Sequence, residues 1–137
     1  MKHLLITISF LLYGLSLSAQ GPFKGKFVND EYEIFLVINL YDKDVLIPNQ
    51  EIYGEMDGFV GSKRNSLVWM ITSSKIVSDK QADIELVNDY GSEDADAVLT
   101  FTDENTLVFN KKKGSNLRFS KNGKWFRTPS KITFIKK

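Results

Sequence analysis

The feature that most constrains the fold is a repeated alternation of apolar and polar side chains along the chain. It is clearest in residues 31–41, where every second residue (Tyr32, Ile34, Leu36, Ile38, Leu40) is apolar and falls on one side. A period of two residues is the signature of a half-buried β-strand. Shorter runs of this kind recur, separated by clusters of Gly, Asn, Asp and Ser, and residues 20–137 contain no helical period of useful length. The sequence therefore predicts an all-β fold.

The turn signals indicate how these strands are connected. They recur roughly every eight to twelve residues, a spacing typical of consecutive hairpins. Asn122-Gly123 is the sharpest of them, because this dipeptide favours the tight turns of two-residue hairpins. Closing the sheet removes exposed strand edges. We predict an antiparallel up-and-down β-barrel of about eight strands, with a β-sandwich as the alternative.

Residues 1–19 have the pattern of a cleavable signal peptide. Lys2 and His3 precede an uncharged apolar run over residues 4–17, and small residues follow, ending at Ala19. This order is typical of export, and the apolar run is short for a membrane anchor. We expect residues 20–137 to form a single β-barrel domain that is exported to the periplasm or secreted. The sequence has no cysteine, so we expect neither disulfides nor a lipid anchor on cysteine.

The residue types present exclude much catalytic chemistry. The one histidine is His3, so residues 20–137 contain neither His nor Cys. Catalysis by Ser-His-Asp or Cys-His groups, and metal sites built on those residues, are therefore excluded. The acidic segment 88–96 is better interpreted as a solvated loop than as a calcium site. We expect no enzyme, no cofactor and no metal, and a carboxylate-based hydrolase is the least favoured function.

Aromatic residues suggest a binding function. An eight-stranded barrel is near the size at which the interior either is filled by side chains or holds one small ligand. Core packing is the simpler interpretation for any one aromatic residue. For a small apolar or amphipathic ligand, the candidate residues are Phe35, Trp69, Phe101, Phe119 and Trp125.

The charge distribution suggests a second function, that of a surface-acting interaction or inhibitor protein. Residues 111–137 carry ten basic residues and no acidic one, whereas all 17 acidic residues lie before them. An anionic envelope component or protein is the partner that these basic strands would fit, and export argues against nucleic acid. The alternative is that the opposite charges pair with one another between strands. The oligomeric state stays open.

Two short motifs resemble those of calycin or lipocalin-like barrels. Gly25-Lys26-Phe27 stands where lipocalins have Gly-x-Trp, and Gly123-Lys124-Trp125 precedes the expected closing strand. The chain also resembles small exported proteins of Bacteroidota, whose leaders often end as Ser18-Ala19-Gln20 does here. The resemblance implies an up-and-down barrel that binds a small apolar ligand, and it implies no catalytic residue.

Overall fold

The computed structural model describes residues 21–137, so the predicted signal peptide at residues 1–19 lies outside the described range. The described chain consists of strands and one short 3₁₀-helix. Their bounds are β1 Lys24–Asn29, β2 Ile34–Asn39, β3 Val45–Leu46, η1 Glu51–Tyr53, β4 Glu55–Met56, β5 Gly58–Ser62, β6 Val68–Ile76, β7 Gln81–Asn88, β8 Asp94–Asp103, β9 Thr106–Gly114, β10 Arg118–Lys121, β11 Lys124–Arg127 and β12 Lys131–Lys136.

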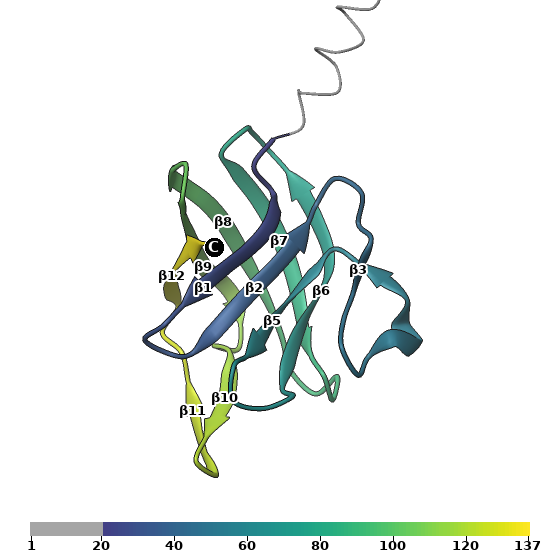
Figure 1. The fold of residues 1–137 in the computed structure, drawn as a ribbon, viewed down its shortest axis with the longest axis vertical. Coiled ribbons are helices and arrows are strands. Elements are labelled where there is room, and N and C mark those ends of the chain that lie inside the picture. Colours follow the sequence, from purple (N-terminus) through teal and green to yellow (C-terminus); the bar gives the residue numbers. More distant parts are fainter. Residues whose placement is uncertain (1–20) are drawn as a thin grey trace, which may run out of the picture.

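Eight of these strands close into an antiparallel barrel, which confirms the predicted fold class (Figure 1). The order around the barrel is β1-β12-β9-β8-β7-β6-β5-β2, so most neighbours in space are also neighbours in sequence. The first and last strands pair with each other, which closes the sheet as a barrel rather than as a sandwich. This is the up-and-down architecture that the resemblance to calycins implied.

Two insertions depart from this simple path. Residues 42–57, here called the excursion, leave the barrel between β2 and β5 and contain β3, η1 and β4. The β10–β11 hairpin, here called the hairpin, lies between β9 and β12 and forms a separate two-stranded sheet. The excursion lies along the side of the barrel, whereas the hairpin extends from its lower end in the view of Figure 1.

Alternation along the strands sets which side chains enter the barrel. In β7, Ala82, Ile84 and Leu86 are buried while Asp83 and Glu85 are exposed, as the pattern predicts. The long alternating run at residues 31–41 is shorter as a strand than its pattern suggests. Its first residues form the β1–β2 turn, where Glu33 takes a positive φ of 55°.

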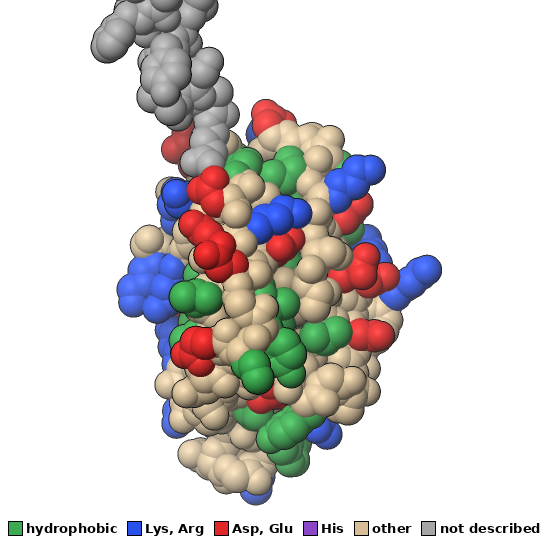
Figure 2. All heavy atoms as spheres, turned by 90° about the vertical axis from the view of Figure 1, so that its right-hand side faces the viewer, with side chains coloured by type: hydrophobic (Ala, Val, Ile, Leu, Met, Phe, Trp, Pro, Cys, Tyr) green, Lys and Arg blue, Asp and Glu red, His purple; other side chains and the backbone are tan. Residues whose placement is uncertain are grey.

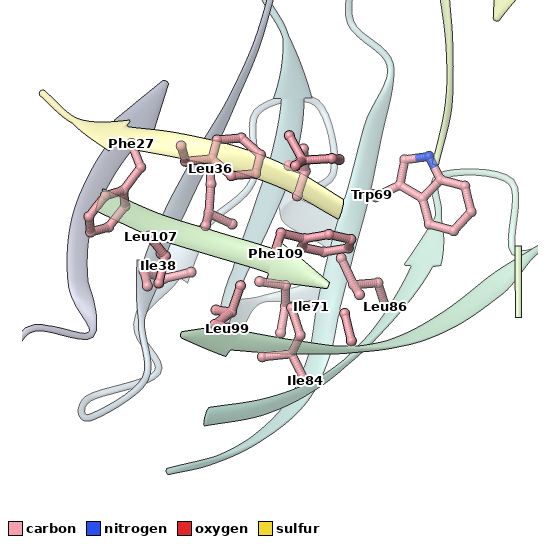
Figure 3. Packing of buried hydrophobic residues seen from close by; sticks show 14 of the residues in the cluster. Phe27, Leu36, Ile38, Trp69, Ile71, Ile84, Leu86, Leu99, Leu107 and Phe109 are labelled. Carbon is pink, nitrogen blue, oxygen red and sulfur yellow. The ribbon is translucent and has the colours of Figure 1, made fainter. Parts of the chain in front are cut away.

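Large apolar side chains occupy the barrel interior (Figure 3). Phe109, Ile71 and Leu36 come from three different strands and are all essentially inaccessible to solvent. They point toward one another across the barrel axis, so opposite walls make contact through their side chains. The interior is therefore a packed core, one of the two outcomes expected for an eight-stranded barrel.

A second apolar cluster lies outside the barrel wall, beneath the excursion. Its buried members are Ile47, Phe59, Val68 and Met70. Phe35 packs against this cluster and meets Phe59 edge to face, with ring centroids 5.7 Å apart. Gly61 makes room for it, because a Cβ at this position would lie 2.8 Å from the Phe35 ring. The excursion is thus attached to the barrel by an apolar layer of its own.

Candidate functional site

The five candidate ligand residues lie in three different environments. Trp69, Phe101 and Phe119 are buried in the main core, so the structure brings these three inside the barrel. Phe35 lies outside the wall in the second cluster. Trp125 lies on the hairpin and is 54% exposed. The five residues therefore do not line one common pocket.

Both ends of the barrel are closed by aromatic side chains. At the upper end, Phe101 meets Phe23 and Phe27 edge to face, at centroid distances of 5.1 and 5.8 Å. At the lower end, Leu117 and Phe119 bury themselves in the same core as Trp69. The Trp69 indole N–H donates to the Arg118 carbonyl oxygen at 3.2 Å, which ties the base of the hairpin to the barrel.

On the solvent side of the aromatic side chains that close the upper end, the surface forms an open depression of about 620 Å³. Phe101 contributes to its wall, together with Lys80, Asp103 and Lys136. Asp103 accepts hydrogen bonds from the Asn105 backbone and the Thr106 hydroxyl, which hold the pKa of its carboxyl below the usual range. Of the candidate ligand residues, Phe101 is the one with access to this depression.

The hairpin has two distinct faces. Its turn residues Asn122 and Gly123 take positive φ angles of 54° and 77°, which confirms the tight turn predicted from the sequence. Phe119 pairs with Phe126 across the strands, and both turn toward the barrel, where Phe126 stacks on Tyr32. Arg118, Ser120, Trp125 and Arg127 share the other face, which points away from the core.

Three turns at the lower end of the barrel hold the hairpin in place. From the β1–β2 turn, the Glu33 carboxylate binds the Lys121 ammonium at 2.9 Å. From the β5–β6 turn, the Asn65 amide donates to the Ser120 carbonyl oxygen at 2.9 Å. From the β7–β8 turn, the Glu93 carboxylate accepts from Arg127 at 2.8 Å. These three contacts, here called the clamps, fix the hairpin to the end of the barrel.

The two clamping carboxylates are held in their charged form. Hydrogen bonds from Arg64 and then Lys121 lower the pKa of Glu33 to about 2. Glu93 lies between Arg127 and Arg118, and the hydrogen bond from Arg127 is the main cause that lowers its pKa. Both clamps persist across the ordinary pH range, because charged partners favour the ionised carboxylate.

The outer face of the hairpin carries a compact group of cationic and aromatic side chains, here called the platform and made of Arg118, Trp125 and Arg127. The Arg118 guanidinium lies over the Trp125 ring, 4.4 Å from its centroid. Both arginines contact Glu93, so the platform keeps a net positive charge. Trp and Arg are the residue types that most often dominate binding energy at protein interfaces.

The platform also borders an open strand edge. The Leu117–Thr128 backbone hydrogen bond fixes which pairs of the hairpin are hydrogen-bonded. By alternation, the N–H and C=O groups of Trp125 and Arg127 point away from β10. No hydrogen bond from residues 21–137 reaches those four backbone groups. An exposed edge of this kind is a site where another chain can add main-chain hydrogen bonds.

Part of the basic segment 111–137 pairs with carboxylates of the acidic part of the chain, although these carboxylates lie in turns rather than on neighbouring strands. Arg118, Lys121 and Arg127 pair with carboxylates at the barrel end. Lys113 lies opposite Asp96 in the β8–β9 ladder. Lys124, at the hairpin tip, has no carboxylate within 4.0 Å among residues 21–137 and adds a free cation beside the platform.

The acidic segment 88–96 is organised by its own backbone. The Asn88 side-chain oxygen accepts from the N–H groups of Ser92 and Glu93, which shapes the β7–β8 turn. Burial raises the pKa of the Asp89 carboxyl.

Across residues 21–137, no three His, Asp or Glu side chains converge in a way that could hold a metal ion. No helix within the same residues has the length and apolar character to cross a membrane.

Comparison of the chain with protein-family models, curated proteins and solved structures gives no match. The candidate site therefore depends on the geometry of this chain alone. Trp125 belongs to the residues predicted to line a cavity, but its pairing opposite Ser120 puts it on a polar face of the hairpin. The excursion has no counterpart among the predicted sites, because its exposed apolar residues Leu46, Ile52 and Tyr53 follow no period of two.

Proposed function

We propose that this chain is an exported binding protein that contacts an anionic partner through the platform on its hairpin. The observation that carries the proposal is the exposure of Trp125 on a hairpin that three turns hold rigid. A tryptophan fixed in advance loses little conformational freedom on binding, which favours affinity. The platform arginines and Lys124 supply the positive charge that selects an anionic surface.

The packed interior also supports a surface function over a ligand held inside the barrel. Trp69 and Phe119 are fully enclosed by neighbouring side chains. Admitting a ligand beside them would require core side chains to separate, at a large cost in packing. The platform requires no such rearrangement, because its groups already face solvent.

The proposal is tested by salt elution from immobilised poly-L-glutamate. The first variant combines Lys124→Glu with Trp125→Ser, which changes the platform and tip without touching the three clamps. The matched control is Lys80→Glu, which makes the same change of two charge units on an exposed lysine at the other end of the barrel. We expect the wild type and the control to be retained at about 0.1 M salt and the hairpin variant to elute early. Equal retention of all three proteins, or none by the wild type, would contradict the proposal.

The depression at the upper end favours a second candidate function, the binding of a small amphipathic molecule against Phe101. Its wall combines this aromatic ring with two cations, Lys80 and Lys136, and with three carboxylates, Asp79, Asp103 and Glu104, which suits an apolar molecule with a zwitterionic head group. The test is calorimetry with dodecylphosphocholine below its micellar concentration. Binding that Lys80→Glu weakens and Lys124→Glu leaves unchanged would support the upper site. Binding that neither substitution alters would refute it.

A further inference from the structure

The excursion presents an apolar surface that the barrel does not use. Ile52 is 92% exposed, and Leu46 and Tyr53 are each 58% exposed. These three side chains form what is here called the excursion patch. Figure 2 shows hydrophobic side chains gathered on the face that bears the excursion, with acidic side chains around them. Leu46 lies in β3, and Ile52 and Tyr53 lie in η1. Large apolar side chains left in water within one short segment are typical of an interaction surface.

The excursion patch is held in place by polar anchors at both ends of the excursion. At its start, the Asn39 side-chain oxygen accepts from the N–H groups of Tyr41 and Asp42. At its end, the buried Asp57 carboxylate accepts from the Ser74 hydroxyl and lies 3.4 Å from the Lys43 ammonium. In the middle of the excursion, Ile47 is buried in the second apolar cluster and so attaches the excursion to the barrel wall. The patch is therefore presented in one conformation, and binding to it costs little ordering.

The charge around the excursion patch is negative. Residues 42–57 contain five carboxylates and one lysine. Glu51 precedes Ile52 in η1, and Glu55 lies opposite Leu46 in the β3–β4 ladder, so both exposed carboxylates border the apolar side chains. A partner that fits this surface carries an apolar anchor with cations beside it.

The hairpin of the same protein has that chemistry. Residues 117–128 contain four basic residues and no acidic one. Trp125 supplies the exposed apolar anchor, and Lys124 and Arg127 flank it in sequence. The excursion and the hairpin are thus opposite in charge and alike in carrying exposed large apolar side chains. Within one chain they extend from different parts of the barrel, so a single copy does not bring them together (Figure 1).

We propose that the excursion patch of one copy receives the platform of a second copy, with Trp125 packing against Leu46, Ile52 and Tyr53. This inference rests on the proposed function, because it identifies the anionic partner of the hairpin as another copy of this chain. The contact joins two different surfaces and is therefore head-to-tail. Such contacts continue from copy to copy, and they build closed rings or open chains according to the rotation between neighbours.

The test is sedimentation velocity of residues 20–137 over a range of about 1 to about 500 µM, where contacts of moderate affinity become visible. We expect association that grows with concentration and weakens between about 0.05 and about 0.5 M salt. Ile52→Asp damages the excursion patch, and Trp125→Asp damages the platform. Each substitution alone is expected to weaken association at least about tenfold, as loss of an interface anchor does. Val77→Asp places the same charge on an exposed residue of the β6–β7 turn and is expected to leave association unchanged.

Mixing the two damaged proteins separates this arrangement from symmetric or non-specific association. The Ile52→Asp protein keeps an intact platform, and the Trp125→Asp protein keeps an intact excursion patch. We expect an equimolar mixture to form a one-to-one dimer that neither protein forms alone. A mixture that stays monomeric, or a wild type that is monomeric at every concentration, would overturn the self-association. If a monomeric wild type still binds poly-L-glutamate through Trp125 and Lys124, the proposed function survives, and if it does not, both fail.

Discussion

Truncation of Phe109 to alanine measures directly whether the barrel interior is packed. Phe109 comes from β9 and is 1% exposed, and its ring lies among side chains from the opposite wall (Figure 3). Removing a fully buried phenylalanine side chain costs about 3–5 kcal/mol, because apolar contacts are lost and a cavity remains. For a domain of this size each kcal/mol lowers Tm by about 4 °C, so we expect a fall of roughly 12–20 °C.

The assay is thermal and urea unfolding of the wild type, Phe109→Ala and Phe126→Ala. Phe126 is only half-buried on the hairpin, so its truncation is expected to cost clearly less. The new cavity also predicts ligand binding, because a dry apolar cavity accepts benzene. Benzene should raise the Tm of Phe109→Ala and leave that of the wild type unchanged. A loss below about 1 kcal/mol in Phe109→Ala, or equal stabilisation of the wild type by benzene, would refute the packed interior.

Three further predictions follow from the clamps, the anchors and the tryptophans. The pKa of Glu33 is lower in the folded chain than in the unfolded one, so its contribution to stability is present above about pH 4.5 and is lost as the pH falls toward 2. The Tm difference between the wild type and Glu33→Gln should therefore shrink over that range, and a constant difference would contradict the clamp. Asn39→Ala removes the acceptor of the Tyr41 and Asp42 N–H groups, which are partly exposed, at a cost of about 0.5–1.5 kcal/mol per hydrogen bond, so trypsin should cut after Lys43 faster than in the wild type. Trp125 is exposed and Trp69 is buried, so acrylamide should quench the wild type strongly and Trp125→Phe weakly; equal quenching would show that the hairpin does not hold Trp125 in water.

Local patterns in the sequence were sufficient to predict the barrel. The alternation of β7 and the Asn122-Gly123 turn are set by neighbours only a few residues apart, so the sequence predicts them directly. A residue count from that turn also pairs Trp125 with Ser120, which places it on the face of Arg118 and Arg127. The exposure of Trp125 was therefore predictable from the hairpin register, although its residue type alone suggests burial.

The excursion was not predictable in the same way. Its strands are two residues long. Its apolar residues have no regular spacing, because some are buried against the barrel and others are exposed to solvent. Ile47 is buried against the outside of the barrel, whereas Ile52, five residues later, is almost fully exposed. The difference arises from contacts with Phe59 and Met70, which are distant in sequence. A single sequence carries no local signal for such contacts, and strand propensity yields to tertiary packing there.

The short pairing between β1 and β12 has a consequence for how the protein folds. The register joins only Phe27 with Lys136 and Val28 with Ile135, although these residues lie more than a hundred positions apart in the sequence. Bringing such distant strands together is slow, because the loop entropy is lost before the contacts form. Until β12 arrives, β1 and β9 each keep an open edge that can pair with other chains. The chain is therefore most prone to aggregate before β12 pairs with β1 and β9. A higher protein concentration during refolding should lower the yield of the closed barrel.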